Sequence, residues 1–407
     1  MLVQRVEQHI IDRQSTWYKM LEEKCHVAKN IYNHGNYLIR QEFIKNGRWM
    51  RYVEVEKLVK NNLDFPNYWE WNLANSGQQV LRRLDKDWKS FFTSIRNWKE
   101  NPSKYKWMPK LPKYLKKDGL AEFSLTTQQV RLKNDNLVHF PKSMNGFTLQ
   151  PQFIYDERFV QFNQCRIVPK NDRIIVELIY TINIPDFVKE QKSIASIDLG
   201  LDNFVTLVDN LGNKPIIING KGLKSCNHYY NKLIAQTKSE LDRNDNSGYS
   251  HLLYSITNKR NDKIKYFMDK ASKYVVENCL NLRIKTIVVG KNDLQKQNSK
   301  LKNFVQIPYS LFIQKLAYKC QEAGIELILT EESYTSGTSF LDDELPTKEN
   351  YDISRRIKRG LFKSNSGRLI NADVNAAYQI MKKVFHDAVK PTDIGLVMNP
   401  VRVNISF

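Results

Sequence analysis

The sequence predicts an α+β protein of several domains, and three stretches of the chain lead to that prediction. Residues 10–100 place apolar side chains at the spacing of helices, and residues 120–190 alternate apolar with polar side chains as strands do. Residues 193–385 alternate strand-like with helical segments, which is typical of an α/β domain with a mixed sheet. At roughly 100–200 residues per domain, the 407 residues suggest about two to four domains.

The charge balance narrows the classes of partner. The chain carries 63 Lys and Arg against 43 Asp and Glu, a formal net charge of +20. An excess of this size favours a polyanionic partner, nucleic acid first and an anionic membrane surface second. The sequence contains no run of about 18 apolar residues, so we expect no transmembrane helix.

The N-terminal segment and the cysteines favour a cytosolic protein. Charged residues interrupt the apolar stretch of MLVQRVEQHIIDRQS and no small-residue cleavage site follows, so we expect no secretory signal. The cysteines are scattered, odd in number and form no CxxC pair. This pattern argues against a disulfide framework and against a zinc site with paired-cysteine spacing.

Two helices are expected in the first hundred residues. Residues 10–45 show apolar side chains at helix spacing without a proline, and Gly47 is the expected end of that helix. Residues 78–98 show the same spacing and carry arginines and lysines on their other faces. Those cations suit a solvated helix face and a contact with a nucleic-acid backbone about equally, so both interpretations stay open.

Residues 101–120 differ from what precedes them. They hold six Lys and three Pro, so they cannot form one helix. The aromatic residues Tyr105, Trp107 and Tyr114 are interleaved with the lysines. Phosphate neutralisation combined with base or sugar stacking fits this composition, and an extended basic linker is the alternative.

The remaining elements follow from alternation and turn residues. Segments 131–140, 146–154 and 173–184 are expected to be strands of a mostly antiparallel domain. Residues 193–210 predict two strands joined by a tight turn. Beyond them we expect a helical stretch at about 228–280, a buried strand at 286–290, a helix at 308–323, a strand at 325–330, a loop-rich segment, and a final helix at about 374–385.

Three carboxylates stand at strand ends or at a helix start. Asp198 ends a predicted strand, Glu332 follows the strand 325–330, and Asp373 precedes the final helix. Converging carboxylates are able to hold two Mg²⁺ ions. Taken alone, however, Asp373 is better explained as a helix N-cap, and Asp198 before Leu199-Gly200 also suits a turn. Spacing by itself therefore leaves a metal site and local structural roles both open.

Sequence motifs around these acids resemble a known family. The segment IDLGLDNFVTLV around Asp198 resembles the first RuvC motif of an RNase H-like nuclease, and INADVNAAYQI around Asp373 resembles the third. NFVQIP, TEESYTSGTSFLDDELP and RRIKRGLFKSNSGRLI are similar to the corresponding part of TnpB, as are HIIDRQS…AKNIYNHGNYLIRQEF and PKLPKYLKK. The chain is therefore identified as a member of the TnpB family, proteins of insertion-sequence transposons related to the miniature type V CRISPR effectors.

The resemblance implies a domain layout. A wedge β-barrel would be formed by residues 1–9 and 112–190, with a helical recognition domain inserted at residues 10–111. An RNase H-like (RuvC) α/β domain would follow at residues 191–407, with a small insertion at about 333–370.

The sequence departs from the family pattern in two places. Gly290 occupies the position where TnpB proteins usually carry the second catalytic acid, and the nearest acid there is Asp293. Glu332 stands two residues before Tyr334, where some relatives carry a relocated glutamate, whereas Glu331 should point the other way by strand alternation. The insertion also contains no cysteine, so no zinc is expected, and packing or nucleic acid must hold that lobe.

The resemblance implies a Mg²⁺-dependent, RNA-guided DNA endonuclease of the prokaryotic cytosol, associated with the nucleoid through DNA. Asp198, Glu332 and Asp373 would hold two Mg²⁺ ions and hydrolyse DNA beside a short flanking motif. The partners would be a guide RNA encoded beside the gene and double-stranded target DNA, with no membrane. Because Gly290 replaces the usual acid, a nuclease-dead RNA-guided DNA-binding repressor is the alternative. A DNA transposase ranks lower, since no His-x-His motif is evident.

Residue type suggests where nucleic acid would be contacted, because Arg pairs with guanine, Asn with adenine, and lysines neutralise phosphates. The run at 355–359 also suits a solvated charge run. The candidate contacts are Tyr32, Asn36, Arg40, Arg82, Arg83, Lys104, Lys106, Trp107, Lys110, Lys113, Arg355, Arg356, Lys358 and Arg359.

Overall fold

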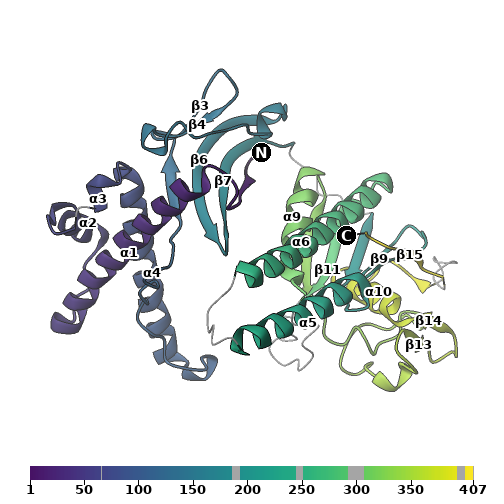
Figure 1. The fold of residues 1–407 in the computed structure, drawn as a ribbon. Helices are drawn as coiled ribbons and strands as arrows, with labels where there is room; N and C mark the ends of the chain where they lie inside the picture. Colours follow the sequence, from purple (N-terminus) through teal and green to yellow (C-terminus); the bar gives the residue numbers. More distant parts are fainter. Residues whose placement is uncertain (66, 186–192, 244–250, 292–306, 392–398, 407) are drawn as a thin grey trace. The chain divides into compact units, whose positions relative to one another are not determined.

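The computed structural model describes residues 1–65, 67–185, 193–243, 251–291, 307–391 and 399–406. The chain divides into two compact units, Met1–Ile184 and Pro185–Phe407 (Figure 1). Each unit has its own apolar cores, so each is treated by itself. In the described residues, no helix is both long enough and apolar enough to cross a bilayer.

An antiparallel sheet forms the frame of the first unit. Its strands β1 (Leu2–Ile11), β7 (Arg173–Asn183), β6 (Phe159–Lys170) and β2 (Phe123–Thr126) lie in that order. The sequence did not single out β6, because polar residues and two register shifts, at Phe159/Gln161 and Phe162/Gln164, break its alternation. The inclusion of β1 in this sheet joins the N-terminus to residues far along the chain.

Four helices precede the middle strands: α1 (Tyr18–Asn46), α2 (Tyr52–Asn61), α3 (Asn67–Glu70) and α4 (Ala74–Glu100). The prediction of one helix from residue 10 is wrong at its start. Residues 10 and 11 extend β1, because Ile11 is buried beside β7, and Asp12 then accepts from the Gln14 and Ser15 N–H groups. The predicted end at Gly47 is confirmed, with φ of 66° and its N–H bonded to the Phe43 carbonyl.

The helices and the sheet of this unit share one apolar core that runs from Ile11 through Trp88 to Leu178. Residues 101–120 contain only the short 3-10 turn η1 (Pro102–Lys104), as their prolines predict. Beyond them, β3 (Arg131–Leu132), β4 (Val138–His139) and β5 (Thr148–Leu149) form a small antiparallel sheet. The short helices η2 (Lys142–Met144) and η3 (Phe153–Tyr155) complete this part.

A mixed six-stranded sheet organises the second unit, in the order β12-β11-β8-β9-β10-β15. Strands β8 (Ile194–Asp198), β9 (Asn203–Asp209) and β10 (Ile216–Asn219) are antiparallel neighbours. Strands β11 (Thr286–Lys291) and β12 (Glu326–Glu331) add on in parallel beside β8, and β15 (Val401–Val403) runs parallel to β10. The predicted mixed sheet is thus confirmed.

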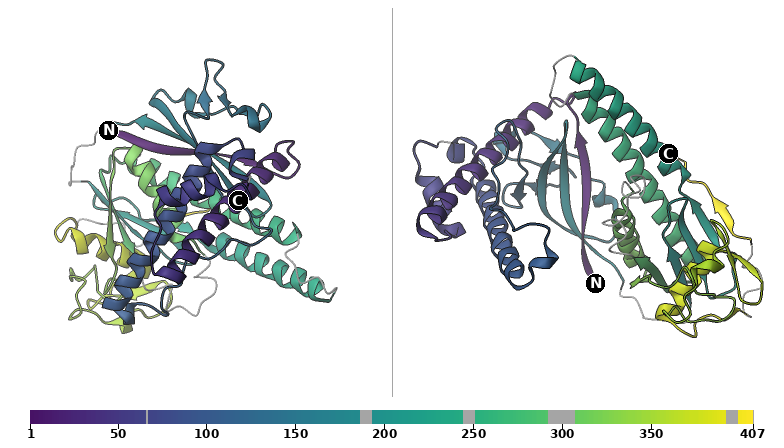
Figure 2. Two further views of the ribbon diagram at one scale, coloured as in Figure 1. Left: turned by 90° about the vertical axis from the view of Figure 1, so that its left-hand side faces the viewer. Right: turned by 90° about the horizontal axis from the view of Figure 1, so that it is seen from below.

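Helices cover both faces of this sheet (Figures 1 and 2). Helices α6 (His251–Asn281) and α9 (Tyr309–Glu322) pack on the face that carries Ala195 and Ile197, and α5 (Lys221–Arg243) lies alongside α6. Helix α10 (Ala372–Val384) packs on the opposite face, against Ile194 and Val288. The helical stretch expected at 228–280 is therefore two helices, and α10 begins two residues earlier than expected.

The segment between β12 and α10 forms a loop-rich lobe with the hairpin β13 (Leu361–Lys363) and β14 (Leu369–Asn371) and the turn η4 (Ile353–Arg355). Its side chains Phe340 and Phe362 enter the same core as Tyr378 of α10, and Phe340 stacks on Tyr378 with ring centroids 4.3 Å apart. The division of the chain into wedge, helical and RuvC domains remains a prediction.

Candidate active site

Strand alternation brings the predicted acids to one face of the sheet. Ile194 and Ser196 of β8 face α10, since Ile194 packs with that helix and the Ser196 hydroxyl donates to the Ala377 carbonyl. Asp198 follows on the same face, because every second residue of a strand points the same way. The parallel strands β8, β11 and β12 end at the same edge, and Asp373 opens the helix that crosses this face.

The ionisation of Asp198 is affected by both other acids. Burial, followed by the negative charges of Asp373 and Glu332, holds the pKa of Asp198 well above its ordinary value, and Arg356 partly opposes this shift. The residue nevertheless keeps part of its surface in solvent. The three acids thus lie close enough for the charges of Asp373 and Glu332 to disfavour the ionised form of Asp198 in the folded protein.

Asp373 is not the N-cap that local reasoning favours. Asn371 caps α10, because its Oδ1 accepts from the backbone N–H groups of Asp373 and Val374. The carboxylate of Asp373 is therefore available for other contacts. Asn203 Nδ2 donates to its Oδ2 at 2.6 Å, and Arg356 Nη2 donates to its Oδ1 at 3.1 Å.

Glu332 lies over the place where β11 has no side chain. A Cβ placed on Gly290 would lie 3.2 Å from Glu332 Oε2, so the carboxylate reaches back across the neighbouring strand. Glu331 is separate from the acids: its carboxylate is 62% exposed and pairs with Lys383 at 2.9 Å. Asp293, the other acid near this strand, lies outside the described residues.

The turn after Asp198 needs glycine, as the sequence suggests. A Cβ on Gly200 would lie 2.5 Å from the Asn203 carbonyl oxygen, closer than any side chain permits. The Gly200 carbonyl accepts from the Tyr309 hydroxyl at 3.0 Å. Burial, and then the charges of Asp198 and Glu332, raise the pKa of Tyr309, so this hydroxyl stays protonated beside the acids.

Sequence reasoning did not find Tyr309 or Asn203 as site residues. Tyr309 opens α9, far from the acids along the chain, and no motif marked it. Asn203 lies within IDLGLDNFVTLV, so the motif itself was the only signal. Both residues act through hydrogen bonds that the fold creates.

The three carboxylates are suitable ligands for a hard divalent cation. Carboxylate oxygens are the ligands that Mg²⁺ prefers, and a cation would relieve the repulsion that raises the pKa of Asp198. Over the described ranges, no group of three or more His, Cys, Asp or Glu forms a ready-made metal site. Both oxygens of Asp373 are engaged by Asn203 and Arg356. Each carboxylate oxygen has a second lone pair, so Asp373 could bind a metal ion while it keeps these two donors.

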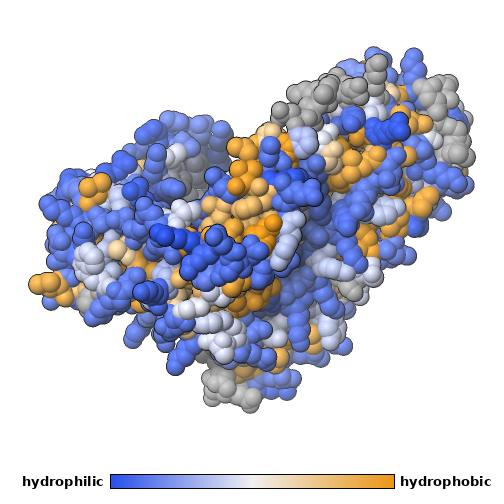
Figure 3. Space-filling view, turned by 90° about the horizontal axis from the view of Figure 1, so that it is seen from above, coloured by the Kyte–Doolittle hydropathy of each residue, from blue (hydrophilic) through white to orange (hydrophobic). Residues whose placement is uncertain are grey.

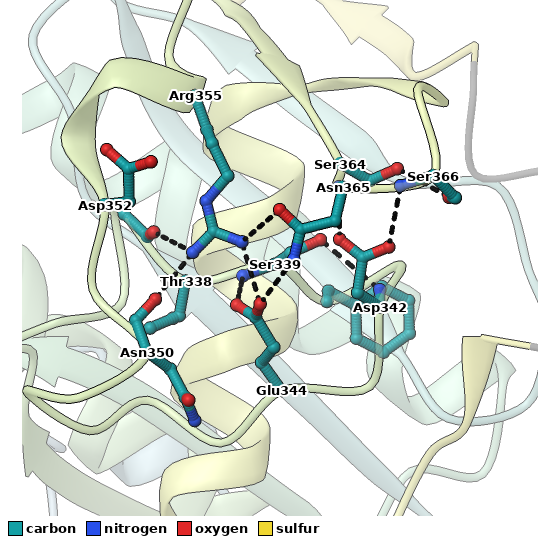
Figure 4. Close-up of polar contacts among 12 residues, drawn as sticks. Thr338, Ser339, Asp342, Glu344, Asn350, Asp352, Arg355, Ser364, Asn365 and Ser366 are labelled. Atoms are coloured by element: carbon teal, nitrogen blue, oxygen red, sulfur yellow. Dashed lines mark hydrogen bonds and ion pairs between the residues drawn. The ribbon is translucent and has the colours of Figure 1, made fainter.

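Arg355 ties the lobe together (Figure 4). Its guanidinium donates to Glu344 Oε1 at 2.8 Å, and to the carbonyls of Gly337 and Asn350 at 2.7 and 2.6 Å. Asp342 accepts from the backbone of Asn365 at 2.7 Å, which fixes the tip of the hairpin. Ordinary packing and hydrogen bonds thus hold this lobe, which is one of the two possibilities that the absence of cysteines left.

Helix α10 holds the lobe through buried polar contacts. Asn375 is fully buried, donates to the Thr338 carbonyl and accepts from the Phe340 N–H. Lys382, only 2% exposed, pairs with Asp343 of the lobe. These contacts therefore fix the helix that carries Asp373 to the lobe that carries Arg356.

We expect Arg355→Ala to loosen this lobe. The side chains of Arg355 and Glu344 are 10% and 17% exposed, so the change leaves a largely buried carboxylate without its partner. Such a loss costs about 3 kcal/mol, at the low end of the range for buried pairs, and lowers Tm by roughly 6–12 °C. Thermal unfolding measures it, with the exposed Lys358→Ala as the matched control. Equal Tm values for the two variants would contradict the structural role of Arg355.

The structure removes three residues from the predicted nucleic-acid contacts. Tyr32 is buried and its hydroxyl donates to Asp87, and Asn36 is fully buried between Trp88 Nε1 and the Pro112 carbonyl. The Nη1 and Nη2 groups of Arg355 donate inside the lobe, and its Nε is buried. Each residue type was suitable, but burial and internal hydrogen bonds leave little of these three side chains for an outside partner.

The other candidates keep accessible surface. Arg40 donates to the Pro112 carbonyl and lies over the Tyr114 ring, Arg82 lies over the Tyr52 ring, and Arg83 pairs with Glu122. Arg359 pairs with Asp202 in the turn between β8 and β9. The exposed candidates are Arg82, Arg83, Lys104, Lys106, Trp107, Lys110, Lys113, Lys358 and Arg359, with Trp107 76% exposed.

Comparison with known proteins finds two family models and several solved structures that this chain resembles. Residues 177–296 match the OrfB_IS605 family model, described as a probable transposase, and residues 309–380 match the TNB domain of Cas12f1-like proteins. A structure of a Cas12f1–sgRNA–target DNA complex is similar, with a TM-score of 0.55 and 15% identity over 89% of this chain and 82% of that chain. This likeness shows a shared mixed α+β fold.

Two further solved structures are similar at lower scores. A CRISPR-Cas12f ternary complex has a TM-score of 0.37 and 16% identity over 89% of this chain and 80% of that chain. CasPhi-2 (Cas12j) bound to crRNA has a TM-score of 0.42 and 9% identity over 96% of this chain and 98% of that chain. No curated protein matches significantly. The two family models, which match in the order that the motifs predict, support a TnpB-like family.

Proposed function

We propose that this TnpB-like protein is an RNA-guided DNA endonuclease whose RNase H-like (RuvC) domain spans residues 191–407. The observation that carries the proposal is the placement of Asp198, Glu332 and Asp373 at one edge of the sheet, although they come from distant parts of the chain. A binder without catalysis has no need for three mutually repelling carboxylates. The protein would work in the prokaryotic cytosol, at the nucleoid.

The proposed domain layout agrees with the described elements. The sheet β1-β7-β6-β2 would belong to the wedge domain, residues 1–9 and 112–190, although β1 runs two residues beyond that boundary, and α1 to α4 would form the recognition domain, residues 10–111. The unit boundary at Ile184 lies close to the proposed start of the RuvC domain at 191. The lobe after β12 would be its insertion, at about 333–370.

Asp198, Glu332 and Asp373 would hold two Mg²⁺ ions. When bound, such a pair supplies an activated water and a charge that stabilises the leaving 3′ oxygen. Asn203 orients the Asp373 carboxylate through its 2.6 Å hydrogen bond, and the Tyr309 hydroxyl holds the turn after Asp198. The Arg356 guanidinium compensates the charge of Asp373, and a phosphodiester entering the site offers it a bidentate partner.

The partners would be a guide RNA encoded beside the gene and double-stranded DNA with a short flanking motif. Guide pairing reads the target, while the protein contacts backbones and duplex shape. The net charge of +20 supports this role, because each partner brings dense phosphate. Hydrophilic residues are widespread on the face drawn in Figure 3, with hydrophobic residues between them.

A basic cavity of about 450 Å³ adds to this surface in the first unit. Arg131, Lys133, His139 and Lys142 line it, together with neutral amides. Asp135 is the acid beside them, and it already pairs with His139 at 2.6 Å. The surplus of positive charge suits the phosphates of a single strand.

We expect the triple variant Arg131→Ala, Lys133→Ala, Lys142→Ala to bind guide RNA about tenfold more weakly. The slope of log affinity against log salt concentration should fall by about 2, since each single-strand phosphate contact contributes about 0.7. Filter binding over a series of salt concentrations measures both quantities.

The control for this prediction removes the same charge elsewhere, through the exposed residues Lys19, Lys57 and Lys238 replaced by Ala. A smaller change in the slope is expected for the control. If both triple variants change the slope equally, the cavity has no special role.

Cleavage of a plasmid library with a randomised flank tests the proposed function. The protein is co-expressed with its flanking RNA and assayed with Mg²⁺ and with EDTA. Metal-dependent cuts beside one enriched flank are expected. Guide-matched binding without any cut would instead establish the RNA-guided repressor that the replacement at Gly290 suggested.

A further inference from the structure

We propose that Gly290 is a positioning residue: the absence of a side chain on β11 at this point gives the Glu332 carboxylate its place among the acids. The proposal rests on the proposed function, because it assigns Glu332 to the carboxylate site. It adds a role for two residues outside that site, Gly290 and Ile380 of α10.

Glycine is needed at position 290 for space and not for backbone conformation. Gly290 is absent from the glycines with positive φ, so an L residue could adopt its backbone angles. It is buried in the middle of the sheet and lies opposite Thr330 of β12. A glycine in a strand interior packs no side chain and destabilises the strand, so its presence calls for a close neighbour.

Two neighbours occupy the space that a side chain would take. A Cβ on Gly290 would lie 2.5 Å from Ile380 Cδ1 and 3.2 Å from Glu332 Oε2. Ile380 is fully buried with Val288 and Tyr378, and such a core yields little to an added methyl group. Ile380 of α10 and Glu332, which directly follows β12, thus fill the space beside Gly290.

A consequence follows for the usual position of the second acid. A glutamate introduced at 290 would meet Ile380 before its carboxylate reached the acids, and it would displace Glu332. In this packing an acid at 290 would therefore compete with Glu332 for the same space. The replacement of the acid by glycine and the use of Glu332 are two parts of one arrangement.

The test separates packing from positioning with a double variant. Gly290→Ala should lower the Tm of the metal-free protein through its clash with Ile380. Adding Ile380→Val removes Cδ1, relieves that clash, and should return Tm to near that of Ile380→Val alone. Ile380→Val does not alter Glu332, so the added Cβ should still approach its Oε2 in the double variant.

The second readout is the Mg²⁺ or Mn²⁺ concentration that gives half of the metal-induced rise in Tm, which requires no cleavage. In Gly290→Ala and in the double variant it should increase about 10- to 100-fold, the range for residues that orient metal ligands. Ile380→Val alone should keep the wild-type value, and Glu332→Gln should lose most of the rise.

Recovery of both Tm and the metal midpoint in the double variant would overturn the proposal, because Gly290 would then matter for packing alone. An unchanged midpoint in Gly290→Ala would overturn it as well. Absence of any metal-induced rise in the wild type would overturn it together with the carboxylate site. If the midpoints shift as expected but no guided cleavage is found, the positioning role stands and the proposed nuclease activity fails.

Discussion

Asp198→Asn is expected to reduce guided DNA cleavage about 10³-fold or more and, in metal-free buffer, to raise Tm. Loss of several kcal/mol of charge stabilisation in the transition state corresponds to that rate, at 1.36 kcal/mol per tenfold change. The rise in Tm follows because the variant removes a carboxylate that burial and two neighbouring acids destabilise. About 2–4 °C is expected for each kcal/mol relieved. Plasmid cleavage and metal-free thermal unfolding measure the two effects.

The pH dependence gives the same prediction a second measurement. The folded-state pKa of Asp198 lies above the unfolded value, so its contribution to stability is fully present below the unfolded pKa and is lost as pH rises through the folded pKa. Wild-type protein should therefore lose more stability than Asp198→Asn as pH rises from the ordinary aspartate range, about 3.9, to neutrality. Target binding should be retained in the variant. Parallel stability curves for the two proteins would show that Asp198 is not destabilised by its neighbours.

Glu332→Gln is expected to abolish cleavage to a similar extent, whereas Glu331→Gln should change it only a few-fold. The two residues are adjacent, but Glu332 faces Asp198 and Glu331 lies in solvent, paired with Lys383. An exposed ion pair of this kind contributes about 1 kcal/mol or less. Single-turnover cleavage at saturating Mg²⁺ compares them.

This pair of variants tests which of the two glutamates the nuclease uses. Equal activity of Glu332→Gln and wild type would mean that the relocated glutamate is not used. A strong loss in Glu331→Gln would mean that the wrong neighbour had been assigned to the site. Guide-dependent binding, measured on the same preparations, shows whether each variant remains assembled.

Local patterns predicted most elements of the fold because local forces determine them. Helix spacing located α1 and α4, the prolines excluded a helix at 101–120, and alternation located β8, β9, β11 and β12. The errors fell where distant contacts override local preference. Ile10 and Ile11 suit a helix, but pairing with β7 extends β1 through them. Strand β6 was not predicted, because its register shifts interrupt the alternation of apolar and polar residues.

The candidate site divides in the same way. Asp198, Glu332 and Asp373 could be proposed from motifs, but their local contexts suited turns and caps equally. The structure shows that Asn371, not Asp373, caps α10 and so leaves the Asp373 carboxylate to Asn203 and Arg356. Residue type does not reveal burial. The structure shows that Tyr32, Asn36 and Arg355 are largely buried, whereas most of the other candidate contacts remain exposed.

The sequence by itself determined the class of the protein: its charge, its order of elements, its motifs and the replacement of the usual acid by Gly290. Only the tertiary structure decided why that replacement is compatible with a site. Helix α10 brings Ile380 against Gly290, and the neighbouring strand brings Glu332 across it. Packing sets the distances between residues that are far apart in the chain. Their spacing along the sequence therefore does not predict these distances.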